Sequence, residues 1–410
     1  MKLDKPINIL TADLVIPDLI VNISDNPKLQ DLVDKYQLKR GGKIALTSDQ
    51  FKEFSAVVDK MKKDGKVIVE PGGSSANVLV TLSKLLGKGK LNVKYFGVVG
   101  DDEYTDIVKR SLKDAGIELV PDPETYKNQK PETARSFILM YPDGARTIAT
   151  YPGNARDILK ADMVTEDMVK KSDVVFMLGS ACERFDHGFV NKITDMRFKN
   201  QKELWLALPT HAEFGKENGE LFRYIIPSAN VILGNKGELE RIYENELEKV
   251  DNGSGKKVDA IHALRDLLEK RKDLFDNEGW KSYRQPVALI TDDIEPAYVI
   301  TGVGDPNKDD STRGITKIDT KKVESINVVS TLGAGDTSFA GFLAGLAKNR
   351  TNEESAELAM ALAGEKVRNF GPRLKYPRAS LHTAANFNRI PKELANSILN
   401  PEREMTGVGR

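Results

Sequence analysis

The sequence predicts a three-layer α/β fold in which a central, mainly parallel sheet is covered by helices on both faces. Short β-branched runs alternate with segments of helical periodicity between about residues 66 and 292, the order typical of a parallel sheet. These runs are apolar almost throughout, as expected of strands that are buried on both faces. Since 410 residues exceed the usual size of one core, we also expect a second, smaller unit.

The first 70 residues depart from this alternation. The run "INILTADLVIPDLIVNI" is strand-like, and Pro17 divides it into two short strands or bends a single one. Helical patterns follow at Pro27–Tyr36 and at Ser48–Lys63, where Ser48 or Asp49 is the expected N-cap. We therefore expect residues 1–70, together with 134–151, to contribute strands to a small lid. Residues 71–133 and 152–410 would form the main domain.

The remaining elements follow in order. "KVIVEPGGSSANVLVTLSKLLG" predicts a strand, a glycine turn and a helix that ends at Gly87. Pro142-Asp143-Gly144 between two strand-like runs indicates a hairpin. The other expected strands are "NVKYFGVVG", "DVVFMLGS", "ELWLAL", "NVILGN" and "PVALITD", each followed by a helical segment or a loop.

Composition restricts the possible partners. Basic and acidic residues both total 61, so the net charge is zero, and no long basic segment is available to neutralise nucleic-acid phosphates. The single cysteine excludes an internal disulfide, and no apolar run reaches the roughly 18 residues of a membrane helix. We expect a cytoplasmic protein that binds small molecules, without nucleic-acid or membrane partners, either as a monomer or as a homodimer paired through its lids.

The segment "STLGAGDTSFAGF", residues 330–342, predicts a phosphate site. Gly333, Ala334 and Gly335 precede an apolar helical pattern, so they would expose backbone N–H groups at a helix N-terminus. Asp336 adds a carboxylate beside them, which would repel phosphate unless it accepted a proton from an attacking hydroxyl. The alternative is a helix start that simply packs closely on a strand.

Three motifs together resemble the ribokinase family of PfkB-type carbohydrate and nucleoside kinases. "TLGAGDTSFAGF" resembles the family's C-terminal motif, "PGGSSANV" with "GVVGDD" its N-terminal motif, and "NVILGNKGEL" its N-x-x-E segment. The resemblance implies a ribokinase-like fold and transfer of the γ-phosphoryl group of ATP to a hydroxyl group, with Mg²⁺ as the metal.

The resemblance also implies roles for individual residues. Asp336 corresponds to the catalytic base, and Gly333, Ala334 and Gly335 correspond to the anion hole. The residues that correspond to acceptor-binding positions of the family are Asp18, Gly72, Gly73 and Asn77. Those that correspond to nucleotide-binding positions are Asn235, Thr291 and Thr331. Glu238 corresponds to the residue that organises Mg²⁺ through water. Two positions depart from the family pattern, because Ser330 and Asp293 stand where an aspartate and a glycine are expected. Ser330 leaves activation by a monovalent cation such as potassium in doubt.

The acceptor is suggested by a second resemblance. "ARTIATYPGNA" is similar to the corresponding stretch of adenosine kinases and inosine-guanosine kinases, which implies that Arg146 lies on the lid near the transferred phosphate. Asp13 stands where that branch has a residue contacting the base or ribose. The expected substrate is a purine nucleoside, phosphorylated on its ribose 5′-hydroxyl. Two alternatives remain open: a kinase of free sugars or sugar phosphates, and a catalytically weak regulator that binds nucleotides or nucleosides.

Overall fold

The computed structural model describes residues 5–208, 225–244, 259–277, 285–292, 295–302, 313–319, 328–386 and 390–399. Within them a nine-stranded sheet forms the centre of the molecule, in the order β14-β13-β12-β11-β10-β9-β1-β5-β6. Neighbouring strands are parallel from β12 to β6 in this order. The pairs β12–β13 and β13–β14 are antiparallel. The strands are β1 (Ile7–Ala12), β5 (Leu91–Phe96), β6 (Ile117–Val120), β9 (Val174–Leu178), β10 (Glu203–Ala207), β11 (Val231–Asn235), β12 (Val287–Asp292), β13 (Glu295–Thr301) and β14 (Ile315–Ile318).

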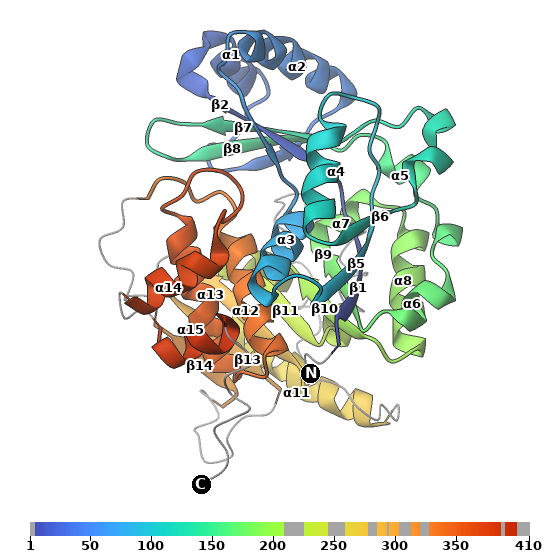
Figure 1. Ribbon diagram of the computed structural model, residues 1–410, viewed down its shortest axis with the longest axis vertical. Helices are drawn as coiled ribbons and strands as arrows, with labels where there is room; N and C mark the ends of the chain where they lie inside the picture. Colours follow the sequence, from blue (N-terminus) through green and yellow to red (C-terminus); the bar gives the residue numbers. More distant parts are fainter. Residues whose placement is uncertain are drawn as a thin grey trace.

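Helices cover both faces of this sheet, which confirms the expected three-layer α/β fold (Figure 1). One layer contains α3 (Ser74–Leu86), α4 (Thr105–Asp114), α12 (Ala334–Ala347), α13 (Asn352–Lys366), α14 (Pro377–Asn386) and α15 (Lys392–Leu399). The other contains α6 (Glu166–Lys171), α8 (His187–Lys199), α10 (Lys236–Ile242) and α11 (Ala260–Asn277). The short helices α5 (Ala155–Ile158) and α7 (Gly179–Arg184) lie in connections.

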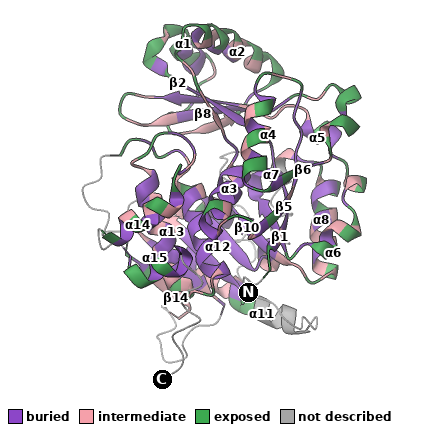
Figure 2. Cartoon of the chain, in the orientation of Figure 1, coloured by how far each residue is buried: buried purple, intermediate pink, exposed green. Residues whose placement is uncertain are grey.

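Burial follows from the sequence pattern. Every residue of β9 is buried, as expected of an apolar strand between two helical layers. The helix α12 is apolar on nearly all sides, and from Thr337 to Ala347 it is buried throughout. Figure 2 shows this buried centre, with exposed residues concentrated on outer helices such as α1 and α2.

A separate five-stranded sheet has the order β3-β8-β7-β2-β4. Its strands are β2 (Pro17–Asn22), β3 (Lys43–Ala45), β4 (Ile68–Pro71), β7 (Arg135–Met140) and β8 (Arg146–Tyr151), and α1 (Pro27–Lys35) and α2 (Ser48–Lys63) cover its outer face. The expected hairpin is confirmed, since β7 and β8 pair in antiparallel orientation around Gly144. Figure 1 shows this smaller layer above the main sheet.

Alternation along the strands gives the five-stranded sheet two different faces. Leu19 and Phe137 pack with α1 and α2, whereas Ile20 and Ile138 pack with Leu332 of the main domain. Asp18 is two residues before Ile20 on β2, so it belongs to the same face of the sheet, the inner face that is turned toward the main domain. This sheet therefore presents one face to its own helices and the other to the segment before α12.

Two expectations require correction. The strand β1 lies within residues 1–70, which we expected to supply lid strands, but it occupies the nine-stranded sheet between β9 and β5. The chain passes from one sheet to the other between Ala12 and Pro17, so the N-terminal run is two strands in different sheets. The N-cap of α2 is Thr47 in a capping box with Gln50, and neither Ser48 nor Asp49.

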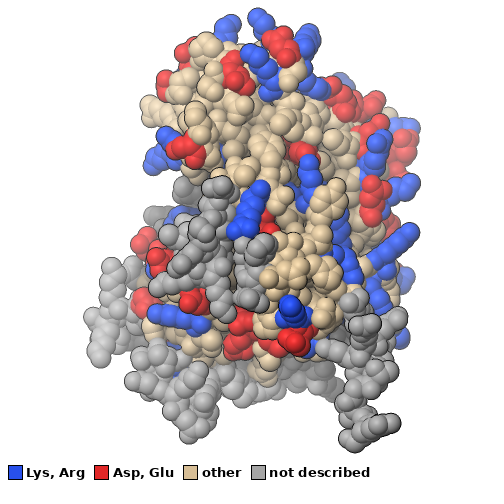
Figure 3. Space-filling model, turned by 60° about the vertical axis from the view of Figure 1, so that its left-hand side comes forward, with Lys and Arg blue, Asp and Glu red and all other residues tan. Residues whose placement is uncertain are grey.

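Neither the charge distribution on the surface nor the hydrophobicity of the described helices is extreme. On the face shown in Figure 3, basic and acidic side chains are interspersed and form no extended field of one sign. Among the described helices, none is both long enough and apolar enough to cross a membrane.

Candidate active site

The candidate site lies where the carboxyl ends of the central strands face the five-stranded sheet. Asp13 follows β1 directly, and Asn235 and Thr291 lie opposite each other at the ends of β11 and β12. The strand order reverses at β1, because β5 and β6 follow it on one side and the chain then returns to place β9 on the other side. Open α/β sheets bind ligands at such a point.

The loop before α12 has the geometry of an anion site. Gly333 has a φ of +75° and caps the helix, and a Cβ built there would lie 1.8 Å from the carbonyl oxygen of Pro372. Ala334 N donates to Thr331 O at 3.2 Å. The amides of Gly335 and Asp336 have no hydrogen-bond acceptor among the described residues. Gly335 is exposed and faces open space, so a phosphate oxygen could approach these amides.

Asp336 is held by α3. Nδ2 of Asn77, which is buried, donates to Oδ2 of Asp336 at 2.8 Å. Burial raises the pKa of Asp336, while the Asn77 amide, the charge of Lys43 and the Ser74 hydroxyl lower it. The helix terminus alone would keep this carboxylate ionised, but burial acts in the opposite direction. Burial prevails, so the pKa of Asp336 lies above its ordinary value and its ionised form accepts a proton more readily.

Asp18 lies in a space that glycine creates. A Cβ on Gly72 would be 2.3 Å from Cγ of Asp18, so any larger residue there would displace this carboxylate. Gly73, with a φ of +86°, caps α3 and completes the turn. Burial raises the pKa of Asp18 to about 7, against the charge of Arg373, and the negative charge of Asp336 adds to the increase. Asp18 and Asp336 therefore share one electrostatic environment.

Asn235 and Glu238 form a capping box at the start of α10. Oδ1 of Asn235 accepts the Glu238 N–H, and Oε2 of Glu238 accepts the Asn235 N–H, both at 2.9 Å. Burial raises the pKa of Glu238 to about 7, whereas the backbone N–H of Asn235 and the charge of Lys43 lower it. Among the described residues, no three acidic, histidine or cysteine side chains are placed so that they could together hold a metal ion. A single buried carboxylate fits Mg²⁺, which usually takes its other ligands from phosphates and water.

Two cations approach from the inner face of the five-stranded sheet. Nη1 of Arg146 donates to Oγ1 of Thr331 in the loop before α12. Lys43 is on β3, whose neighbour in the sheet is β8, the strand that begins at Arg146. Burial lowers the pKa of Lys43, and the negative charges of Glu238 and Asp336 oppose this. Both cations thus lie near the carboxylates of the main domain.

Two other expected site residues, Asp13 and Thr291, are less directly connected to Asp336. Asp13 is buried, and its oxygens accept the N–H groups of Leu14 at 2.8 Å and Ser75 at 3.3 Å, with Arg184 at 3.7 Å. Thr291 donates only a long hydrogen bond to Gly234 O, at 3.4 Å, and no contact joins it to Asp336 among the described residues.

The two positions that depart from the family pattern differ in what the structure shows of them. Ser330 is buried, and its Oγ accepts the Leu332 N–H at 3.2 Å. Asp293 lies outside the described residues.

Several cations near the site were not identified from the sequence, among them Lys43, Arg184, Lys366 and Arg373. Lys366 is fully buried at the end of α13, and burial together with the charge of Arg146 lowers its pKa to about 8. No local motif singles out Lys43 or Arg373, because both reach the site through contacts between segments that are distant in the sequence.

Comparison with known proteins relates the sequence to one family of kinases. A model described as pfkB family carbohydrate kinase matches residues 43–275 and 280–379. The adenosine kinase of Saccharomyces cerevisiae is 23% identical over 353 residues, which cover 84% of this chain and 90% of that protein. A probable fructokinase-5 of Arabidopsis thaliana is also 23% identical, over 72% of this chain and 79% of that protein.

The fold is also found among solved structures. The adenosine kinase of Schistosoma mansoni in complex with 2-fluoroadenosine aligns with a TM-score of 0.67 at 19% identity, over 90% of this chain and 98% of that one. At this identity the likeness shows the fold alone.

Proposed function

Because the chain belongs to the pfkB family of carbohydrate kinases, we propose that it phosphorylates a purine nucleoside, adenosine, inosine or guanosine, on the ribose 5′-hydroxyl. Members of this family are ATP-dependent kinases that act on hydroxyl groups of sugars or nucleosides, so the chain is an ATP-dependent phosphotransferase. The observation that carries the proposal is the position of Asp336, beside open amides and linked by charge to buried Asp18.

In the proposed reaction Asp336 accepts the proton of the acceptor hydroxyl as its oxygen attacks the γ-phosphorus of ATP in line. The bond to the β–γ bridging oxygen breaks, and ADP leaves with the electron pair. Asn77 supports this role, since its N–H favours the ionised form that can accept the proton. Asp18 would hold the substrate by accepting hydrogen bonds from the remaining ribose hydroxyls, in the space beside Gly72.

The charge of the transferred phosphoryl group would be stabilised from two sides. The amides at Gly333 and Gly335 would approach from the main domain, whereas the expected amide of Ala334 already donates to Thr331 O, and Arg146 would approach from the five-stranded sheet. Mg²⁺, held by phosphate oxygens and through water by Glu238, would neutralise further negative charge. Asn235 orients Glu238 through the capping box, and Thr331 and Thr291 stand on the nucleotide side.

The five-stranded sheet would act as a lid. Its inner face meets the main domain through Leu332 and through the Arg146–Thr331 hydrogen bond. A lid in this position excludes water, which limits hydrolysis of bound ATP. In this proposal the lid comprises the strands from Pro17 to Pro71 and from Arg135 to Tyr151, while β1 remains in the main domain.

Two observations favour a nucleoside as the acceptor. The relative in Saccharomyces cerevisiae that is named adenosine kinase aligns over 84% of this chain, more than the 72% covered by the probable fructokinase. The Arg146 segment "ARTIATYPGNA" resembles nucleoside kinases. A second candidate, a sugar kinase, is supported by the fructokinase relative.

A substrate panel tests the proposal. ADP release from Mg-ATP is measured with adenosine, inosine, guanosine, cytidine, ribose, fructose and fructose 6-phosphate, using Asp336→Asn as the background control. Turnover with a purine nucleoside and none with free sugars is the expected result. Turnover with sugars alone would replace the proposed acceptor and keep the fold, and no turnover with any compound would contradict the proposal.

A further inference from the structure

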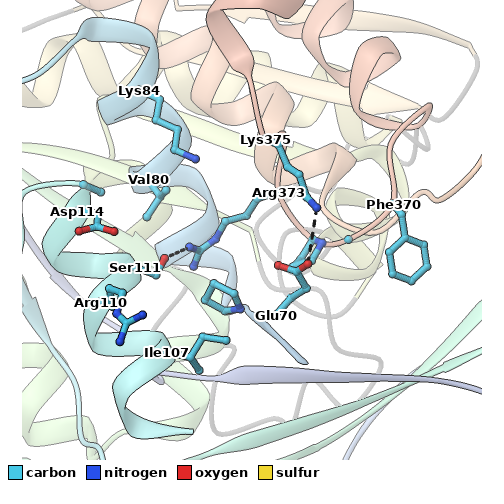
Figure 4. A pocket seen from close by; sticks show the side chains of 14 residues that line it. Glu70, Val80, Lys84, Ile107, Arg110, Ser111, Asp114, Phe370, Arg373 and Lys375 are labelled. Carbon is cyan, nitrogen blue, oxygen red and sulfur yellow. Dashed lines mark hydrogen bonds and ion pairs between the residues drawn. The ribbon is translucent and has the colours of Figure 1, made fainter. Parts of the chain in front are cut away.

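Arg373 lies behind the proposed base and joins three parts of the site. Its Nε donates to Oδ1 of Asn77 at 2.6 Å, and its Nη2 donates to the carbonyl oxygen of Gly72 at 3.1 Å. Its Nη1 donates to Oγ of Ser111 on α4. Figure 4 shows Arg373 reaching between α3 and α4 toward Ser111. One guanidinium group therefore contacts the glycine turn, the helix α3 and the helix α4.

Asn77 is consequently placed between a pure donor and a pure acceptor. A guanidinium group has only N–H donors, so the Asn77 atom that faces it must be the carbonyl oxygen. The amide nitrogen then points to Asp336, where it donates at 2.8 Å. In the opposite orientation the Asn77 oxygen would face the Asp336 carboxylate and its nitrogen would face the guanidinium, and both hydrogen bonds would be lost.

We infer that Arg373 is a positioning residue for phosphoryl transfer, which fixes the side-chain amide of Asn77 so that Asn77 presents an N–H group to Asp336. The inference rests on Asp336 being the base, as proposed above. Arg373 itself does not contact the reacting atoms. Its segment is firmly attached to the site, since the carbonyl oxygen of Pro372 packs against Gly333.

Charged groups surround Asp336, so the hydrogen bond that Asn77 donates to it affects whether Asp336 is ionised. Carboxylates approach from the segment after β1, from β2 and from α10, and cations approach from β3, from α13 and from the segment before α14. They are Asp13, Asp18, Glu238, Lys43, Lys366 and Arg373. Burial lowers the pKa of Arg373 to about 10, so the guanidinium stays charged at neutral pH. Losing the Asn77 donor would favour protonation of Asp336, which must be ionised to act as a base.

The test compares pH profiles of kcat/KM for the full-length wild type, Arg373→Met and Asn77→Ala. We expect each variant to shift the acid limb upward by about one pH unit and to lower kcat by on the order of tenfold. In the double variant the second substitution should add little, because both act through the same amide. Additive effects of the two substitutions would overturn the inference.

A matched control separates positioning from general support of the fold. Arg378 on α14 also donates to backbone carbonyl oxygens, those of Leu85 on α3 and Leu399, and it does not contact Asn77. Arg378→Met can lower the melting temperature but should leave the pH profile unchanged. A similar shift in Arg378→Met would show that the effect is structural, and would overturn the inference.

Chemical rescue gives a second readout. Arg373 lines a pocket of about 340 Å³ together with Glu70, Lys84, Arg110, Ser111 and Lys375 (Figure 4). A free guanidinium ion is small enough to enter this pocket. In Arg373→Ala, millimolar guanidinium chloride should move the acid limb back toward the wild-type position, whereas methylammonium chloride, which lacks the planar fork, should not. Equal recovery with both salts would contradict the inference.

Two variants distinguish an error about the base from an error about Arg373. If Asp336→Asn keeps near wild-type activity, the proposed base is wrong. If Asp336→Asn is inactive but Arg373→Met retains the wild-type acid limb, only the role of Arg373 is wrong.

Discussion

Gly72 and Asp18 fit together so closely that a single methyl group between them is excluded. A Cβ on Gly72 would lie 2.3 Å from Cγ and 2.4 Å from each carboxylate oxygen of Asp18. Gly72→Ala is therefore expected to displace Asp18, to lower the melting temperature and to raise the KM of the acceptor. The double variant Gly72→Ala/Asp18→Ala should recover melting temperature but not acceptor binding. If Gly72→Ala binds the acceptor like the wild type, Asp18 is not a substrate contact.

Substitutions in the loop before α12 should separate folding from phosphate binding. Gly335→Ala adds a methyl group in open space, so the melting temperature should change little while kcat falls and the KM of ATP rises. Gly333→Ala places a Cβ against Pro372 O at a φ of +75°, so it should destabilise the fold as well. Melting curves and steady-state kinetics of the two variants check this. A fully active Gly335→Ala would place the phosphate elsewhere.

Removing the proposed base should affect turnover without unfolding the protein. Asp336→Asn keeps the side-chain volume, and we expect kcat to fall by on the order of 10²–10⁴. Measurement of ADP release alongside circular dichroism separates the two effects. Activity within tenfold of the wild type would remove Asp336 from the mechanism.

Asp18 should make the ligand-free protein less stable as the pH rises. Its pKa is raised from 3.8 to about 7 in the folded state, chiefly by burial, so between these values the folded protein keeps a proton that the unfolded chain has lost. Its contribution to stability is complete below pH 4 and is lost as the pH rises through 7. Urea unfolding of the wild type and Asp18→Asn from pH 4 to 8 tests this. The stability of the wild type relative to Asp18→Asn should fall across that range, and a constant difference would contradict the assignment.

Lys43 is expected to matter for catalysis although no motif identifies it. It contributes a positive charge near Glu238 and Asp336, where the phosphates of ATP are proposed to bind. Lys43→Met should lower kcat/KM for ATP by on the order of 10²-fold, comparable to the loss of one preorganised donor. Lys35 on α1 provides the control, because it pairs with Glu53 on the outer side of the same sheet. If Lys35→Met and Lys43→Met behave alike, the effect of Lys43 is not local to the site.

Much of the fold could be predicted from the sequence because its signals are local. Period-two and helical patterns, and glycine at Gly87 or Gly144, predict strands, helices and turns from neighbouring residues alone. The N-cap of α2 was misplaced because Thr47, Ser48 and Asp49 are all good capping residues. The sheet to which β1 belongs could not be read locally, since β1 and β2 are both short, largely apolar strands and their sheets are set by long-range partners.

Residues of the candidate site could be predicted from the sequence only where they belong to a recognisable motif. The glycines and Asp336 belong to such a motif. The hydrogen bond of Arg373 to Asn77 joins residues 296 positions apart, so no spacing rule could reveal it. The raised pKa values of Asp18 and Glu238 also depend on burial, which arises only in the folded chain.

The most direct test of the central claim is identification of the product by ³¹P nuclear magnetic resonance. Purified protein is incubated with Mg-ATP and adenosine, inosine or guanosine in separate samples, with Asp336→Asn as the control. We predict that a nucleoside 5′-monophosphate appears in at least one sample, in step with ADP, and that Asp336→Asn forms it far more slowly. Absence of any phosphorylated nucleoside, with phosphate transferred only to free sugars or to none of the acceptors, would contradict it.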